Sequence, residues 1–238
     1  MSAASNLFNA EEILDGICGW VRVESPTYEP DRVNRMMDEA EGAMRTLGAA
    51  IERIPGTDGY ADVVKATLPF GDDPDAPGIL VLGHLDTVHP GGTIDGPLQL
   101  RREGDKVFGP GIYDMKGGMY LAYYALRQLL KAGQQPALPV IFLFIPDEEV
   151  GSPSTRALIE AEAKRSRCVL VPEPSRQGNV VTGRHAFLRY RLHMHGKPAH
   201  AGADNRAGRS AIRAMARLID RLEGMSDFER GITYSVGV

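Results

Sequence analysis

Apolar residues recur at helical spacing along the first part of the chain, before residue 50. Leu14, Ile17 and Val21 fall on one face of a first predicted helix. The sequence ESPTYEP interrupts the pattern, and residues 33–47 resume it with Met36 inward. Because apolar residues three and four positions apart share one helix face, this pattern predicts two amphipathic helices.

From residue 62 onward, short apolar runs alternate with helical patterns. The run PVIFLFIP is apolar on both faces, which is typical of a fully buried strand. The turn-rich segment 70–78 predicts a hairpin between its flanking strands, and Gly104-Asp105 marks a second hairpin. Alternating strands and helices predict an α/β domain with a partly parallel sheet flanked by helices. The predicted strands are 63–70, 78–86, 139–146 and 167–173, and the predicted helices are 119–131 and 155–164.

The pattern changes near Gly183. Residues 187–196 alternate apolar and polar side chains, as a strand with one solvent-exposed face does, and a helix is predicted over 210–222. We therefore predict one domain over 1–183 and the start of a smaller α+β domain over 184–238. Residues 232–238 have the pattern of a strand that stops in mid-course, so we expect the chain to be truncated at its C-terminus.

Composition narrows the class of protein. Hydrophobic residues make up 43% and charged residues 24%, which is ordinary for a globular protein. The net charge of −4 gives no electrostatic reason to expect nucleic acid, and no apolar run approaches the roughly 20 residues that cross a bilayer. The N-terminus lacks the features of a secretory signal, and Cys18 and Cys168 are expected to be buried thiols. These features predict a cytoplasmic protein with neither nucleic acid nor membrane as a partner.

Acidic residues and one histidine follow the predicted strands where each strand ends. Loops at the carboxyl ends of strands can direct side chains into a common cleft. One imidazole with several carboxylates is a ligand set for a divalent cation. The residues concerned are His84, Asp86, Asp114, Asp147, Glu148, Glu149 and Glu173.

Each of these motifs has another interpretation. The His84-x-Asp86 pair occurs often as surface or capping residues, and Asp114 in its glycine-rich turn could form an Asx-turn. Glu148 and Glu149 could be acids that stabilise the N-terminus of the next helix. Glu173, which precedes Pro174, could be only an acid that ends a strand. Taken together, these interpretations require four independent coincidences at four strand ends, and a metal site requires none.

The adjacent glutamates, Glu148 and Glu149, are expected to have two different roles. Neighbouring side chains in an extended or turn segment point in different directions, so one can ligate a metal while the other faces a bound water. A metal lowers the pKa of its water towards about 7, and a nearby carboxylate can take the proton as the water attacks a carbonyl.

Five motifs then identify a family resemblance across essentially the whole chain. GHLDTV, GIYDMKGG, PDEEVGS, PEPS and GKPAHAG, in this order, resemble the di-zinc family of acetylornithine deacetylase, succinyl-diaminopimelate desuccinylase, aminoacylase and bacterial glutamate carboxypeptidase. The resemblance is greatest to the glutamate carboxypeptidase branch. It implies a three-layer α/β/α catalytic domain of the zinc-exopeptidase type, followed by a lid or dimerisation domain.

The resemblance also implies a role for each site residue. His84 and Glu173 would ligate one zinc, Asp114 would bridge two zincs, and Glu149 would ligate the second. Cobalt is a possible substitute for zinc. The peptide bond after Asp114 is a candidate for the cis form.

Three further residues acquire roles in the same way. Glu148 would be the general base, and Asp86 would hold His84 in the correct tautomer. His200 would cross a homodimer interface and steady an oxyanion in the partner subunit, although a polar-turn histidine is the alternative. Other histidines, such as His89, match no motif and are expected to be structural or exposed.

The predicted activity is zinc-dependent hydrolysis of an amide or peptide bond, in an N-acyl amino acid or at a C-terminal residue, as in a carboxypeptidase. An amino-acid deacetylase or desuccinylase is an alternative, and so is an inactive fragment that only binds. The family pattern includes a further histidine ligand for the second zinc beyond residue 238, so we expect that site to be one ligand short in this chain.

Overall fold

The computed structural model describes residues 7–175, 177–184 and 186–237. Its chain divides into two compact units, Met1–Val181 and Thr182–Val238. None of the helices in the described residues could span a lipid bilayer, because each is too short or too polar.

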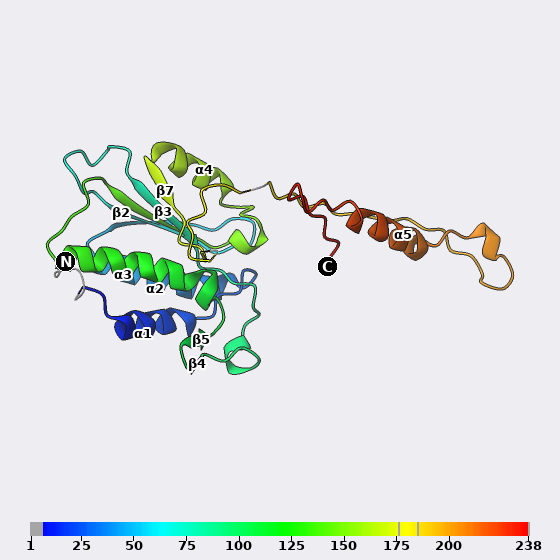
Figure 1. The fold of residues 1–238 in the computed structure, drawn as a ribbon, viewed down its shortest axis with the longest axis horizontal. Coiled ribbons are helices and arrows are strands. Elements are labelled where there is room, and N and C mark those ends of the chain that lie inside the picture. The colour runs from blue at the N-terminus through cyan, green and yellow to red at the C-terminus, as the bar shows by residue number, and fades with distance from the viewer. Residues whose placement is uncertain (1–6, 176, 185, 238) are drawn as a thin grey trace. The chain divides into compact units, whose positions relative to one another are not determined.

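The first unit is built around a mixed five-stranded sheet in the order β1-β2-β6-β3-β7 (Figure 1). Strands β3, β6 and β7 run parallel, whereas β1 and β2 form an antiparallel edge. Two further strands make a separate hairpin, β4-β5. The strands are β1 (Ala50–Ile54), β2 (Val63–Leu68), β3 (Ile79–His84), β4 (Arg101–Glu103), β5 (Lys106–Phe108), β6 (Val140–Ile145) and β7 (Cys168–Leu170).

Helices cover both faces of the sheet, so the predicted three-layer α/β/α arrangement is confirmed (Figure 1). On one face, α1 (Ala10–Val21), α2 (Pro30–Thr46) and α3 (Gly117–Lys131) enclose the larger apolar core. On the other face, α4 (Arg156–Arg165) packs against a smaller core. Burial of these apolar side chains supplies the main stabilisation of the layers.

One strand pairing differs from the sequence prediction. β2 and β3 were expected to form a hairpin, but β6 lies between them and pairs with both. The reason is that β6 is apolar on both faces, so it is best buried in the middle of the sheet. In that position a strand pairs with it on each side. The β4-β5 hairpin is confirmed, with Gly104 in the left-handed conformation at its turn.

Strand β7 is less buried than its sequence predicts. It occupies one edge of the sheet, and the side chains of Cys168 and Leu170 are exposed. The prediction of a buried Cys168 thiol is therefore wrong, and Cys18 is only half-buried.

The second unit contains one long helix, α5 (Ala211–Glu223), as predicted. Ser210 caps its N-terminus by accepting a hydrogen bond from the backbone N–H of Arg213. The strand predicted over 187–196 is not formed, and its large side chains, such as Phe187 and Tyr190, are exposed. A strand requires a ladder partner, and the described residues of this unit pair only at two isolated bridges.

Candidate metal centre

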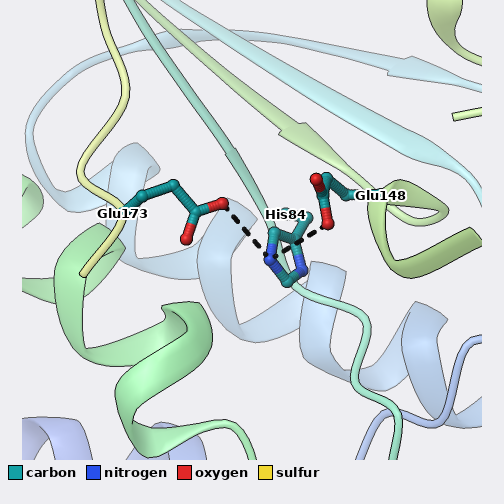
Figure 2. A group of neighbouring side chains, drawn as sticks. All are labelled: His84, Glu148 and Glu173. Atoms are coloured by element: carbon teal, nitrogen blue, oxygen red, sulfur yellow. Dashed lines mark ion pairs between the residues drawn. The ribbon is translucent and has the colours of Figure 1, made fainter. Parts of the chain in front are cut away.

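The parallel strands bring the predicted ligands to one edge of the sheet, which is the edge formed by the carboxyl ends of these strands. His84 is the last residue of β3, and Glu148 and Glu149 follow β6, the neighbouring strand. Glu173 follows β7, the neighbour of β3 on the other side. Because parallel strands end at the same edge, His84 lies between Glu148 and Glu173, as Figure 2 shows.

Asp114 reaches this edge from the turn Ile112–Lys116 that precedes α3. The Asp114–Met115 peptide bond is cis, as the resemblance implied. Two glycines allow the close packing around this turn. A Cβ on Gly83 would lie 2.2 Å from the sulfur of Met119, and one on Gly118 would lie 1.7 Å from the carbonyl oxygen of Pro172. These positions hold the start of α3 against β3 and against the segment that carries Glu173.

The imidazole of His84 is at the centre of the resulting group. Its Nε2 is 3.0 Å from Oδ1 of Asp114, 3.8 Å from Oε2 of Glu148 and 3.7 Å from Oε1 of Glu173. Ligand atoms of His84, Glu148 and Glu173 lie within 4.8 Å of one another, and so do those of His84, Asp114 and Glu149. We call these five residues, His84, Asp114, Glu148, Glu149 and Glu173, the His84 cluster.

Asp86 contacts the His84 cluster but is not one of its five residues. Nδ1 of His84 lies 2.9 Å from the backbone carbonyl of Asp86 and 3.3 Å from its Oδ1. A carbonyl oxygen can only accept, so Nδ1 carries the proton in the neutral ring. The lone pair of Nε2 then faces the cluster, as a metal ligand requires.

The carboxylate of Asp86 also fixes the two glutamates. It accepts the backbone N–H of Glu148 at 3.2 Å and that of Glu149 at 3.3 Å. The hydroxyl of Thr27 donates to it at 2.7 Å, and both Thr27 and Asp86 are buried. One buried carboxylate therefore joins its own segment to two others.

The His84 cluster contains more negative charge than its own cation balances. Burial lowers the pKa of His84, but hydrogen bonds to Asp114 and Asp86 outweigh that effect and raise the pKa to about 11. Burial raises the pKa of Glu149 to about 7, and nearby negative charges add to the shift although His84 opposes it. Burial raises the pKa of Glu173 to about 7 in the same way. These carboxyls compete for one imidazolium.

This donor set fits a divalent cation. One imidazole nitrogen and four carboxylates are suitable ligands for zinc. A cation among them would replace the His84 proton and neutralise the carboxylates whose pKa values burial and repulsion raise. The chemistry of the described residues is thus consistent with the metal that the resemblance implied.

One of the alternative interpretations from the sequence does not match the structure. Helix α4 begins only at Arg156, so Glu148 and Glu149 are not acids of its first turn. Asp147, by contrast, is structural. It is buried and accepts hydrogen bonds from the backbone N–H and hydroxyl groups of Ser154 and Thr155.

The structure adds residues whose place at the site the motifs did not indicate. Lys116 is fully buried and donates to the backbone carbonyl of Val23 at 2.6 Å, and burial lowers its pKa to about 7. His89 is half-buried and, with Tyr113, lines a cleft beside Asp114. The lysine lies inside the DMKGG motif, but its burial has no sequence signal.

His200 lies in the second unit, within an exposed turn. Its Nδ1 accepts the backbone N–H groups of Gly202 and Ala203 at 3.2 and 3.1 Å. In the neutral ring, this leaves Nε2 as the donor. His185, another histidine that matches no motif and is expected to be structural or exposed, lies outside the described residues.

Comparison with known proteins gives a consistent family. The family model described as Peptidase family M20/M25/M40 matches residues 80–233. Carboxypeptidase G2 of Pseudomonas sp. (strain RS-16) is 28% identical over 224 residues, which are 90% of this chain and 52% of that protein. Acetylornithine deacetylase of Myxococcus xanthus is 27% identical over 208 residues, 87% of this chain and 53% of that protein. The chain therefore spans about half the length of these two curated relatives.

Solved structures show the same fold at low identity. A tripeptidase from Staphylococcus aureus subsp. aureus Mu50 has a TM-score of 0.62 at 16% identity, covering 92% of this chain and 58% of that one. Human carnosine dipeptidase 1 has a TM-score of 0.58 at 24% identity, covering 68% of this chain and 38% of that one. At these identities the likeness supports the fold alone.

Proposed function

Because the chain belongs to peptidase family M20/M25/M40, we propose that the whole protein is a zinc-dependent hydrolase that cleaves an amide or peptide bond. The proposed substrates are N-acyl amino acids or peptides that lose their C-terminal residue, as the name of the carboxypeptidase relative suggests. The observation that carries the proposal is the His84 cluster, whose carboxylates exceed the available positive charge at the end of three neighbouring parallel strands.

The residues of the His84 cluster divide into metal ligands and a base. We assign His84 and Glu173 to one zinc, Glu149 to a second zinc, and Asp114 to both. Bound zinc would polarise the scissile carbonyl and lower the pKa of a water molecule. In the neutral ring, the hydrogen bond of Nδ1 to the carbonyl of Asp86 leaves Nε2 unprotonated and aimed at the other ligands, so Nε2 would be the metal-binding atom.

Glu148 is the proposed general base. About half of its side chain is exposed, whereas Glu173 is 21% exposed, so Glu148 is the more accessible to water. Its backbone is held by Asp86, which limits the positions that its carboxylate can occupy. Glu148 would take a proton from the attacking water and later deliver it to the leaving amine.

The second unit has a separate proposed role. We assign residues 184–238 to a lid or dimerisation domain that follows a catalytic domain over 1–183, and we expect a homodimer. His200 would donate from Nε2 to the developing oxyanion in the partner subunit, because Nδ1 is occupied by two backbone N–H groups.

A second candidate activity is removal of an acyl group from an amino acid. The 27% identity to an acetylornithine deacetylase favours it. Both reactions hydrolyse an amide with the same site residues, so the bound substrate groups distinguish them. A non-catalytic protein that only binds zinc and ligand is the remaining alternative.

Substitution of Glu148 tests the assignment of the base. In zinc-loaded protein, Glu148→Gln is expected to reduce hydrolysis of N-acyl amino acids by about 10²–10⁴-fold while zinc remains bound. Zinc content is measured on the same sample by elemental analysis. Loss of zinc together with activity would make Glu148 a ligand instead, and unchanged turnover would remove it from the mechanism. Absence of turnover in unsubstituted zinc-loaded protein would favour the binding alternative.

A further inference from the structure

A cleft opens directly beside the His84 cluster. Its volume is about 230 Å³, and its walls include Val88, His89, Ile112 and Tyr113. Asp114 and Glu149, two residues of the His84 cluster, line the same cleft. A group bound there would therefore touch the proposed metal ligands.

Two large side chains border this cleft without being covered. The side chain of Tyr113 is 70% exposed and that of Val88 is 66% exposed. Tyr113 immediately precedes Asp114, so the turn that positions the metal ligand also positions the ring. Exposed aromatic and aliphatic groups around a polar centre are typical of ligand pockets, in which apolar walls bind the ligand and a few polar groups orient it.

The distribution of charge indicates what kind of group fits. Within the described part of the chain, Asp114 and Glu149 are the acidic residues that line the cleft, and its lining includes His89 but no lysine or arginine. A carboxylate bound here would find no side-chain ammonium or guanidinium partner. An uncharged group needs no ammonium or guanidinium partner, and contact with the apolar walls would stabilise it. The cleft is also smaller than the roughly 300–1,000 Å³ of pockets for drug-sized ligands, so it suits one side-chain-sized group.

The position of Glu148 indicates which side of the scissile bond is bound. Glu148 does not line the cleft, whereas Glu149 does. If Glu148 returns its proton to the leaving amine, the amine lies on its side of the carbonyl. A scissile carbonyl between Glu148 and the cleft would then direct its acyl side into the cleft.

We propose that this cleft binds the acyl group of the substrate, that it prefers an uncharged aromatic group, and that Tyr113 determines this preference by stacking. The proposal rests on the proposed hydrolase function for the orientation of the substrate. Tyr113, the proposed specificity residue, is neither a proposed metal ligand nor the proposed base. Stacking of aromatic rings adds to the gain from burial alone.

Binding of the two simplest acyl products tests this proposal without requiring turnover. Benzoate and acetate share a carboxylate and differ in the group that would enter the cleft. In zinc-loaded protein, calorimetry is expected to give a dissociation constant about tenfold lower for benzoate than for acetate. Tyr113→Ala should remove most of this difference, and Tyr113→Phe should keep it because the ring remains.

A matched control separates the cleft from general effects. Leu129→Ala also truncates a partly exposed side chain, at the far end of α3, and should leave both affinities unchanged. If Tyr113→Ala does not fold, as judged by circular dichroism, Val88→Asp replaces it and should weaken benzoate more than acetate. Equal affinities in the unsubstituted protein, or a benzoate preference that survives both substitutions, would overturn the proposal.

Turnover of N-benzoylglycine and N-acetylglycine distinguishes failure of this proposal from failure of the hydrolase function. The ratio of their kcat/KM values should fall about tenfold in Tyr113→Ala, chiefly through KM. Benzoate preference without turnover of either compound would retain the cleft assignment and remove the hydrolase. Turnover with a ratio that Tyr113→Ala does not change would retain the hydrolase and remove the cleft assignment.

Discussion

Two groups of carboxylates in the first unit differ in how their charge is balanced. In the first, the guanidinium of Arg53 bonds to Asp38 and Asp62 at 2.9 Å and to Glu41 at 3.3 Å. We call these four residues the Arg53 cluster. In the His84 cluster, four carboxylates share one imidazole.

The difference appears in the pKa values. Hydrogen bonds from Arg45 and Arg53 lower the pKa of Glu41. Burial and like charge instead raise the pKa of Glu149 and of Glu173 to about 7. A group of acids therefore does not by itself indicate a metal site. What indicates one is a group of acids for which the chain supplies too little positive charge.

Removal of Asp86 should have the largest effect on the His84 cluster. Asp86→Ala leaves two backbone N–H groups and the Thr27 hydroxyl without their acceptor. We expect zinc affinity to fall about 10–100-fold and the free energy of unfolding to fall by about 2–4 kcal/mol. Competition with a chromophoric chelator and urea unfolding measure the two quantities. Unchanged zinc affinity in a folded variant would show that Asp86 does not position the ligands.

Removal of Arg53 should make the Arg53 cluster resemble the His84 cluster. Arg53→Met leaves Asp38, Glu41 and Asp62 without their shared cation. Because the guanidinium is partly exposed, we expect a loss of about 1–2 kcal/mol in the free energy of unfolding. Arg45→Met, which removes one exposed pair with Glu41, is the control and should cost less. Equal losses in urea unfolding would contradict the proposed balance of charge.

Neutralising one acid of the His84 cluster should stabilise the protein when no metal is bound. The pKa of Glu173 is raised, so its charged form is disfavoured in the folded state at pH 8. Glu173→Gln removes that penalty, and we expect a gain of about 1 kcal/mol in chelator-treated protein. With zinc present the sign should reverse, because a ligand is lost. Glu162→Gln is the opposite control, since Lys65 and Arg165 pair with Glu162; stabilisation by both substitutions would contradict the comparison.

The smallest expected effect concerns the pH dependence of the Arg53 cluster. The folded-state pKa of Glu41 is lowered, so its contribution is present above the unfolded value of 4.5 and is lost as pH falls through the folded value. Glu41→Gln should cost about 0.5 kcal/mol at pH 7 and nothing once Glu41 is protonated in both states. Urea unfolding at pH 7 and in acid measures this difference. A cost that persists in acid would indicate that the effect is not electrostatic.

The features that could be predicted from the sequence are those that depend on local patterns of residues. The period of apolar residues located α1, α2 and α3, and the acids after β6 and β7 were predicted to meet His84 because parallel strands end at one edge. The order of the strands could not be predicted in this way. Whether β2 pairs with β3 or with β6 depends on which pairing best buries the whole sheet, and no local pattern contains that information.

The resemblance implied the support of His84 by Asp86, but other supporting contacts of the site were beyond the sequence. Thr27 and Asp86 are far apart along the chain, and only the tertiary fold makes their hydrogen bond. Asp147 is a buried acceptor rather than a member of the His84 cluster, and this role depends on a turn several residues later. Tyr113 belongs to a recognised motif, but its exposure beside a cleft is visible only in three dimensions.

Zinc titration of metal-free protein tests the central claim most directly, that the His84 cluster and not the Arg53 cluster is the metal site. Calorimetry on the unsubstituted protein, Asp114→Asn and Asp62→Asn compares one acid from each cluster in otherwise identical chains. We predict zinc binding that Asp114→Asn weakens by at least about tenfold and that Asp62→Asn leaves unchanged. Absence of zinc binding, or equal binding by all three proteins, would contradict the account.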